Sequence, residues 1–148
     1  MNKVWLSAAI LAGARAAAFG SPVAEKNVLD IVVSNGPLAG SYHQSDVICM
    51  HAQRQRVFSV AYKDFNPTGA KRFIEGGIEI RDPDIAGAKR ATVSVTLGDP
   101  NKPTIYQISH EPVSFDLNGG RATIAFEGKT DSGVRIKVTA ACLDVTTV

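Results

Sequence analysis

Residues 134–142 read VRIKVTAAC, and this stretch decides the fold class that we expect. Valine and isoleucine alternate in it with arginine, lysine and threonine. Successive side chains of a β-strand point to opposite faces, so the alternation predicts a strand with one buried face and one solvated face. Cys142 shares the parity of the apolar residues, and its sulfur is therefore expected to point into the core.

Similar short runs fill the chain from Val28 onward, separated by glycine, proline, asparagine and aspartate, and no segment keeps a helical period for long. Strands are predicted at 28–33, 41–50, 57–62, around 78–80, and at 92–97, 104–108, 113–117, 122–126 and 134–142. Short turns without a crossover helix predict an all-β fold. We expect an antiparallel β-sandwich of about eight or nine short strands, with a flattened barrel as the alternative. The tail after Leu143 is expected to be frayed.

The chain begins with a pattern typical of a secretory signal peptide. Lys3 supplies a positive start, residues 4–13 are apolar, and residues 14–20 are mostly small. The apolar run is shorter than the roughly 20 residues that span a bilayer. We therefore predict a signal peptide at 1–20, removed on export, and a single all-β domain at 21–148 that resides in the periplasm or outside a bacterial cell.

Removal of the signal peptide also removes the net charge. The whole chain has 16 basic and 14 acidic residues, and Lys3 and Arg15 are the only charged residues among the first twenty. The remaining domain is balanced, so it has no net field to attract nucleic acid or an anionic membrane surface. The basic pairs Lys71-Arg72 and Lys89-Arg90 are interpreted as solvated loop charges. We expect no nucleic-acid partner and no membrane insertion after cleavage.

The predicted exported domain contains two cysteines, Cys49 and Cys142. Thiols in an oxidising compartment form disulfides, and two cysteines allow one intramolecular pairing. Neither cysteine lies in a Cys-x-x-Cys motif, which argues against a redox pair or a metal thiolate site. We predict a structural Cys49–Cys142 disulfide with both sulfurs buried, worth about 4 to 5 kcal/mol in the chain-entropy description.

Three histidines, His43, His51 and His110, are the candidates for metal binding or proton transfer. Imidazole and thioether ligands suit copper, so these residues and Met50 allow a copper site to be considered. On a straight strand, at about 3.3 Å per residue, His43 and His51 would lie more than about 20 Å apart and could not share an ion. A periplasmic copper-binding protein is kept as an alternative function, while the preferred interpretation has no metal site and no cofactor.

Acidic and hydroxyl residues form no recognisable catalytic motif. Three proline-flanked aspartates could supply oxygen ligands for calcium: Asp82, Asp84 and Asp99. Aspartate beside proline commonly forms turns, so the turn role is preferred. Ser45 and Asp46 follow His43 closely, but neighbours along a strand point to opposite faces and do not make a catalytic relay. No catalytic residue is assigned, and an unrecognised hydrolase is a further alternative.

Two segments of the sequence, one with a glycine-rich turn and one that ends in a cysteine, are arranged as in a known group of proteins. Residues 36–42 read GPLAGSY and precede Cys49, and residues 138–142 read VTAAC near the end. With alternating strands between them, this layout resembles small secreted bacterial β-sandwich proteins, in particular mycobacterial surface lipoprotein antigens. The signal region lacks the lipid-bearing cysteine of those antigens. The resemblance implies a non-enzymatic envelope or secreted protein.

Export, the disulfide and the lack of a catalytic motif together predict a function in binding. We expect an exported, non-catalytic β-sandwich protein that binds an unidentified protein or small molecule in the periplasm or outside the cell.

Overall fold

The computed structural model describes residues 26–68 and 72–148, and the predicted signal peptide lies outside these residues. The described chain forms ten β-strands and no helix. The strands are β1 (Val28–Val33), β2 (Gly40–Ser45), β3 (Ile48–Ala52), β4 (Val57–Lys63), β5 (Phe73–Arg81), β6 (Lys89–Asp99), β7 (Lys102–Asn118), β8 (Arg121–Lys129), β9 (Arg135–Cys142) and β10 (Thr146–Thr147). In this part of the chain, no helix is long and apolar enough to cross a membrane.

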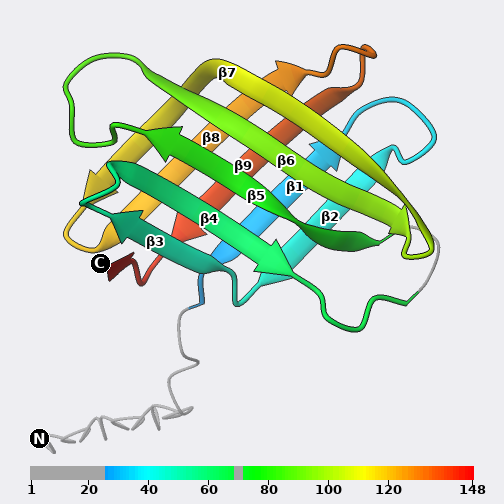
Figure 1. The fold of residues 1–148 in the computed structure, drawn as a ribbon, viewed down its shortest axis with the longest axis horizontal. Coiled ribbons are helices and arrows are strands. Elements are labelled where there is room, and N and C mark those ends of the chain that lie inside the picture. The colour runs from blue at the N-terminus through cyan, green and yellow to red at the C-terminus, as the bar shows by residue number, and fades with distance from the viewer. Residues whose placement is uncertain (1–25, 69–71) are drawn as a thin grey trace, which may run out of the picture.

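All ten strands belong to one hydrogen-bonded sheet with the order β10-β3-β4-β5-β6-β7-β8-β9-β1-β2. Neighbouring strands are antiparallel except β10, which runs parallel to β3. The sheet curls into a half-barrel, so that β3, β4, β5 and β6 form one layer and β8, β9, β1 and β2 lie behind it (Figure 1). The predicted all-β class is confirmed.

The strand β7 explains why the hydrogen bonds show one curled sheet in place of the two separate sheets of the predicted sandwich. It is 17 residues long, and its first part pairs with β6 while its last part pairs with β8. The register against β6 shifts between Ala91 and Val93, and His110 of β7 has a left-handed φ of 58°. Because such an irregularity bends a strand, β7 passes from one layer into the other. The predicted strands at 104–108 and 113–117 are two parts of this one strand.

The apolar faces of the strands fill the space between the layers. In β9 the predicted alternation is confirmed, since Ile136 and Val138 are buried and Arg135 is exposed. Phe58 of β4 and Phe115 of β7 pack against each other with ring centroids 4.9 Å apart. The most deeply buried side chains come from both layers: Leu29, Ile31, Phe58, Val60, Ile80, Val93, Val95, Leu97, Ile136 and Val138.

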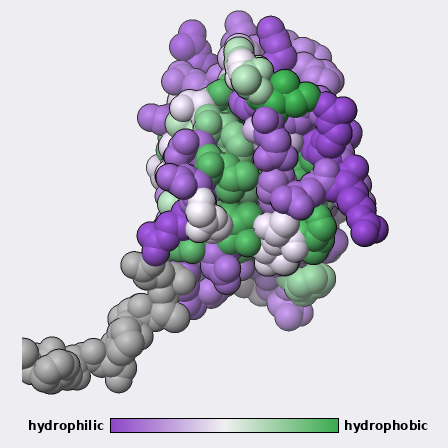
Figure 2. Space-filling view, turned by 90° about the vertical axis from the view of Figure 1, so that its left-hand side faces the viewer, coloured by the Kyte–Doolittle hydropathy of each residue, from purple (hydrophilic) through white to green (hydrophobic). Residues whose placement is uncertain are grey.

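One end of the half-barrel is open between the layers. Figure 2 looks onto the left-hand side of Figure 1, where the β5–β6 loop and the C-terminus lie, and shows apolar side chains in a hollow between hydrophilic rims. Partly buried apolar side chains pack against the core, among them Leu117 and Val145. The core is therefore bounded by the sheet on its sides and reaches the surface at this end.

Two further expectations from the sequence are wrong, one about a strand boundary and one about the C-terminal tail. The predicted strand at 41–50 is divided into β2 and β3, which lie far apart in the sheet, because Asp46 has a left-handed φ of 62° that ends the extended conformation. The tail after Leu143 is not frayed. It forms β10 beside β3, and the N–H of Val148 donates to the carbonyl of His51 at 3.1 Å.

Candidate functional site

The predicted disulfide joins Cys49 of β3 to Cys142 of β9, with their Cα atoms 6.1 Å apart. Both residues are 1% exposed, as predicted. Because β3 is second and β9 eighth in the sheet order, the bond crosses the interior of the curl and connects the two layers. Both sulfurs are used by this bond, so its role is structural.

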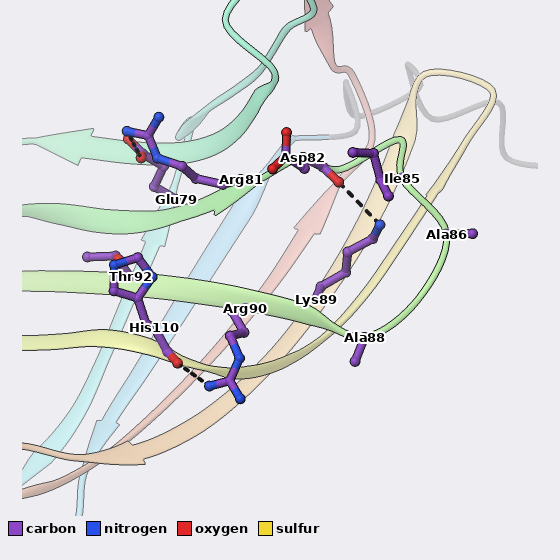
Figure 3. Close-up of a pocket in the computed structure, with 10 residues that line it drawn as sticks. All are labelled: Glu79, Arg81, Asp82, Ile85, Ala86, Ala88, Lys89, Arg90, Thr92 and His110. Atoms are coloured by element: carbon purple, nitrogen blue, oxygen red, sulfur yellow. Dashed lines mark hydrogen bonds and ion pairs between the residues drawn. The ribbon is translucent and has the colours of Figure 1, made fainter.

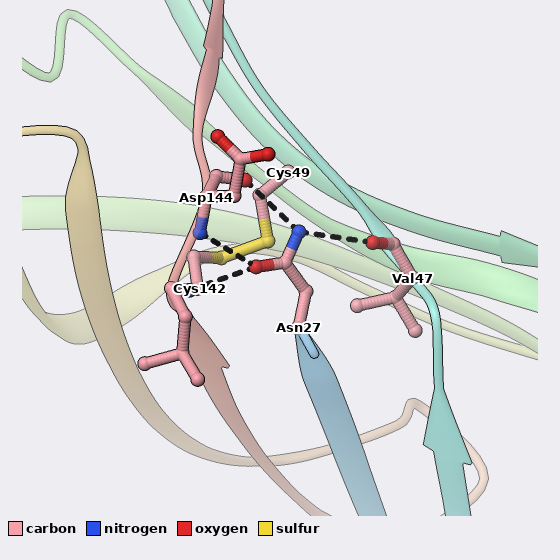
Figure 4. The surroundings of a disulfide bond; sticks show 6 residues. Asn27, Val47, Cys49, Cys142 and Asp144 are labelled. Atoms are coloured by element: carbon pink, nitrogen blue, oxygen red, sulfur yellow. Dashed lines mark hydrogen bonds between the residues drawn. A yellow bond between two sulfur atoms is a disulfide. The ribbon is translucent and has the colours of Figure 1, made fainter. Parts of the chain in front are cut away.

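Asn27 connects the segments around the disulfide (Figure 4). Its Nδ2 donates to the carbonyls of Val47 and Asp144 at 3.2 and 2.9 Å. Its Oδ1 accepts from the N–H groups of Leu143 and Asp144 at 2.7 and 3.0 Å. One side chain thus links the start of β1, the β2–β3 connection and the segment after β9. Nothing local in the sequence distinguishes this residue from an ordinary loop asparagine, so sequence reasoning missed it.

The three histidines lie on different strands. His43 is on β2 and pairs with Asp30 of β1. His51 is on β3, is buried, and has its Nε2 3.0 Å from Oδ2 of Asp84 in the β5–β6 loop. His110 is at the bend of β7. Among the described residues, no group of three His, Cys, Asp or Glu side chains could hold a metal ion.

The other residues considered for metal binding or catalysis are also dispersed. Met50 alternates with the buried Cys49 and His51 along β3, so it lies on the opposite face. Asp99 ends β6, and its Oδ1 accepts from the N–H of Asn101 at 2.9 Å, which is a turn-forming role. The carboxylate of Asp46 pairs with Lys26 at 2.7 Å.

A depression crosses the outer face of β4, β5 and β6, the face that points away from the core. Its floor and walls are mostly small or hydroxyl-bearing, and include Ser59, Ala61, Gly77, Thr92 and Ser94. We call this depression, of about 430 Å³, the outer trough. A second hollow, toward β3, shares Ser59 and Glu79 with it, and a third, beside the β5–β6 loop, shares Glu79 and Thr92. The three hollows therefore meet at Glu79.

Glycine at two positions of β5 keeps the backbones of the trough close together. A Cβ on Gly77 would lie 1.8 Å from the carbonyl oxygen of Val60, and a Cβ on Gly76 would lie 2.2 Å from that of Ser94. No side chain fits at such distances, so the close approach of β4, β5 and β6 requires glycine.

The third hollow, which we call the hairpin pocket, is the charged part of the depression (Figure 3). It has a volume of about 290 Å³. Its ionisable lining residues are Glu79, Arg81, Asp82, Lys89, Arg90 and His110. Glu79 pairs with Arg81 at 3.0 Å, and the Asp82 carboxylate pairs at 2.8 Å with Arg56, which does not line the pocket. The carboxylates of Glu79 and Asp82 are thus each paired with an arginine guanidinium.

The basic pair Lys89-Arg90 has a more defined position than the solvated loop charges that the sequence suggested. Both residues belong to β6 and line the hairpin pocket. Nζ of Lys89 donates to the carbonyl of Asp82 at 3.2 Å, and Nη1 of Arg90 donates to the carbonyl of His110 at 2.6 Å (Figure 3). In residues 26–68 and 72–148, neither cation has a carboxylate partner.

Comparisons of the chain with protein-family models, with curated proteins and with solved structures give no match.

Proposed function

We propose that this chain is an exported, non-catalytic binding protein, and that the outer trough with its adjoining hollows is its ligand site. The observation that carries the proposal is the continuity of the depression: three hollows meet at Glu79, and their lining residues come from the five strands β3 to β7. Ligand sites are usually preformed concave surfaces of roughly 300 to 1,000 Å³ with a few polar groups. The hydroxyls of Ser59, Thr92 and Ser94 supply donors and acceptors on rigid strands.

The polar groups of the trough favour binding over catalysis. A nucleophilic hydroxyl needs a base within hydrogen-bond reach. The acids of the trough are held elsewhere, since Glu75 pairs with Lys63 and Glu79 with Arg81, each at 3.0 Å. Within the described chain, no hydrogen bond joins Ser59 or another trough hydroxyl to a histidine or a carboxylate.

The proposed location rests on the signal-like start of the chain together with the buried disulfide, which suits an oxidising compartment. It also agrees with the resemblance to small secreted bacterial β-sandwich proteins. Expression of the full chain in a bacterium, followed by intact mass measurement without reductant, tests it. We expect an extracytoplasmic product that has lost about 20 residues and contains no free thiol. A full-length cytosolic product with two free thiols would contradict the location.

The ligand site can be tested by nuclear magnetic resonance on the ¹⁵N-labelled protein with a library of small polar molecules. We expect amide shift changes to cluster at the outer trough, around Gly77 and Ser94. Ser94→Arg fills the trough and should abolish these changes. Ser114→Arg is the matched control, because Ser114 is an exposed serine of β7 outside the trough, and this variant should bind as the wild type does.

Two results would overturn the proposal. The first is binding that persists in Ser94→Arg with shift changes clustered elsewhere on the molecule. The second is turnover of an ester, glycan or peptide substrate that is lost on a single polar substitution, which would make the protein an enzyme.

A further inference from the structure

The outer trough contains a buried hydroxyl that no described protein group satisfies. Thr96 of β6 lies on the same face of its strand as Thr92 and Ser94, lines the trough with them, and is only 9% exposed. Its hydroxyl has no hydrogen-bond partner among the described residues. Every fully buried polar side-chain atom in residues 26–68 and 72–148 does have a partner. The Thr96 oxygen is therefore open to the trough, where a ligand can bond it.

The register of the strands gives the trough a low floor between two higher sides. The floor is a row of small residues that stand opposite one another: Ala61, Gly77 and Ser94. The flanking rows carry mostly larger side chains and are Ser59-Glu79-Thr92 and Lys63-Glu75-Thr96. They lie four residues apart along the strands, which is about 13 Å at about 3.3 Å per residue. The trough is thus a furrow across the strands.

The floor suits the flat face of a ring. Gly77 has no side chain, so the peptide backbone itself forms the centre of the floor. Hydroxyl groups stand on both sides of it, with Thr96 in one flanking row and Ser59 and Thr92 in the other. A ring with apolar faces and a polar edge can therefore lie over Gly77 and present its edge to these hydroxyls.

The charges of the trough favour a neutral ligand. Its two acids are each paired at 3.0 Å, Glu75 with Lys63 and Glu79 with Arg81 (Figure 3). A charged ligand would have to compete with one of these ion pairs. A purely apolar ligand would remove water from the Thr96 hydroxyl without replacing its hydrogen bond, which costs free energy. The ligand that fits best is neutral and carries hydroxyl groups.

We propose that the outer trough binds a short neutral oligosaccharide, with one sugar ring over Gly77 and its hydroxyls bonded to Thr96 on one side and to Ser59 and Thr92 on the other. A pyranose ring has apolar C–H groups on its faces and hydroxyls along its edge, and hydroxyls both donate and accept hydrogen bonds. The hollow that continues toward β3 gives room for a further ring. This inference rests on the proposed binding function and names the class of ligand.

Amide shift changes on the full ¹⁵N-labelled chain test the inference with four probes: maltotriose, cellotriose, triacetylchitotriose and the neutral peptide N-acetyl-trialanine amide. We expect at least one sugar to bind and to shift the amides of Gly77, Ser94 and Thr96, and the peptide to bind more weakly. The best sugar is then compared with its derivative oxidised to a uronate at each C6 position. This derivative should bind at least about threefold more weakly, because Lys63 and Arg81 are already paired with the acids of the trough.

Matched variants test the role of the buried hydroxyl. Thr96→Val replaces the hydroxyl by a methyl group and should weaken binding of the best sugar about three- to tenfold, the effect of one lost hydrogen bond. Thr96→Ser keeps the hydroxyl and should bind nearly as the wild type does. Thr123→Val is the control, since Thr123 is an exposed threonine of β8 outside the trough, and it should leave binding unchanged. Thermal unfolding shows whether each variant is folded. If Thr96→Val is unfolded, Thr92→Val replaces it.

Three results would overturn the inference. They are the absence of shift changes with all three sugars, binding of the peptide or the uronate as tight as that of the best sugar, and equal binding by wild type and Thr96→Val. In each case the proposed function still stands if another polar molecule binds and its binding is lost in Ser94→Arg. The proposed function fails separately if no ligand binding depends on Ser94.

Discussion

At the scale of single residues, the Asn27 side chain makes four hydrogen bonds to the backbone of two other segments, the β2–β3 connection and the segment after β9. Asn27→Ala should lower the free energy of unfolding by about 2 kcal/mol, because two of these bonds are partly buried and the backbone partners lose all of them together. Urea unfolding measures the change. Asn101→Ala removes an exposed turn asparagine whose side chain makes no described contact and should cost much less. Equal effects of the two substitutions would contradict the connecting role of Asn27.

Gly77 offers a second test at this scale. Its missing side chain allows β4 to approach β5, and a methyl group there would overlap the carbonyl of Val60. We expect Gly77→Ala to destabilise the fold by about 3 kcal/mol, since backbone of a neighbouring strand must move. Gly119→Ala is the comparison: a Cβ there meets nothing within 4 Å, and its φ of +57° costs only about 1 kcal/mol. Urea unfolding measures the loss of stability in each variant. Similar losses for Gly77→Ala and Gly119→Ala would show that the neighbouring strand moves easily to accept a methyl group at Gly77.

Asp64 gives the stability a pH dependence. The N–H of Asn66 donates to its Oδ1 at 2.9 Å, and Arg72 pairs with it, so the pKa of Asp64 is lowered from its ordinary value of 3.8. A carboxyl whose pKa is lower in the folded chain stabilises the fold above its unfolded-state pKa, and loses this effect as the pH falls through the folded-state pKa. Asp64→Asn should therefore be less stable than wild type at pH 6, with the difference shrinking below about pH 4.

Thermal unfolding across this pH range measures the effect of Asp64. Asp116→Asn controls for the loss of one negative charge, because Asp116 is exposed and makes no described hydrogen bond or ion pair. A difference between wild type and Asp64→Asn that is constant with pH would rule out ionisation as its cause.

At the scale of elements, the disulfide connects two strands that are not neighbours in the sheet and are not hydrogen-bonded to each other. It joins β3 to β9 across 93 residues of chain. The Cys49→Ala/Cys142→Ala double variant should lose roughly 4 kcal/mol of stability in urea, because the open chain gains entropy on unfolding. Wild type in reductant should lose about as much, and the double variant should be insensitive to reductant. A loss below about 1 kcal/mol would mean that strand pairing and Asn27 suffice to hold the layers together.

The elements also show which parts of the fold can be predicted from the sequence. The alternation in β9 placed Cys142 on the buried face correctly, because a regular strand has a fixed period of two. The same rule failed at Asp46, where one left-handed residue ends a strand without disturbing the apparent alternation. At His110 the error is the opposite one. The pattern predicts two strands there, whereas a bulge lets β7 continue as one strand. Single-residue changes of backbone conformation carry no periodic signal.

At the scale of the whole molecule, the candidate site was beyond the reach of sequence reasoning for a different reason. Ser59, Gly77 and Ser94 become neighbours only because β4, β5 and β6 pair in one particular register. Each lies on the solvated face of its strand, where small and polar residues are ordinary. The pair Lys89-Arg90 was visible as charge, but its place beside His110 depends on the bend of β7.

The position of the disulfide has a mechanical consequence for the whole molecule. When the unfolded chain is pulled near the two ends of the domain, force passes through residues 26–49, the sulfur bridge and residues 142–148. The loop between the cysteines, which lie 93 positions apart, then bears no tension. In single-molecule stretching, reduction of the bond should lengthen the unfolded chain by roughly 330 Å, the extended length of that loop. Equal contour lengths with and without reductant would show that the bond is absent. The residues of the outer trough and the hairpin pocket all lie between the two cysteines, in the part of the chain that the bond keeps from being extended.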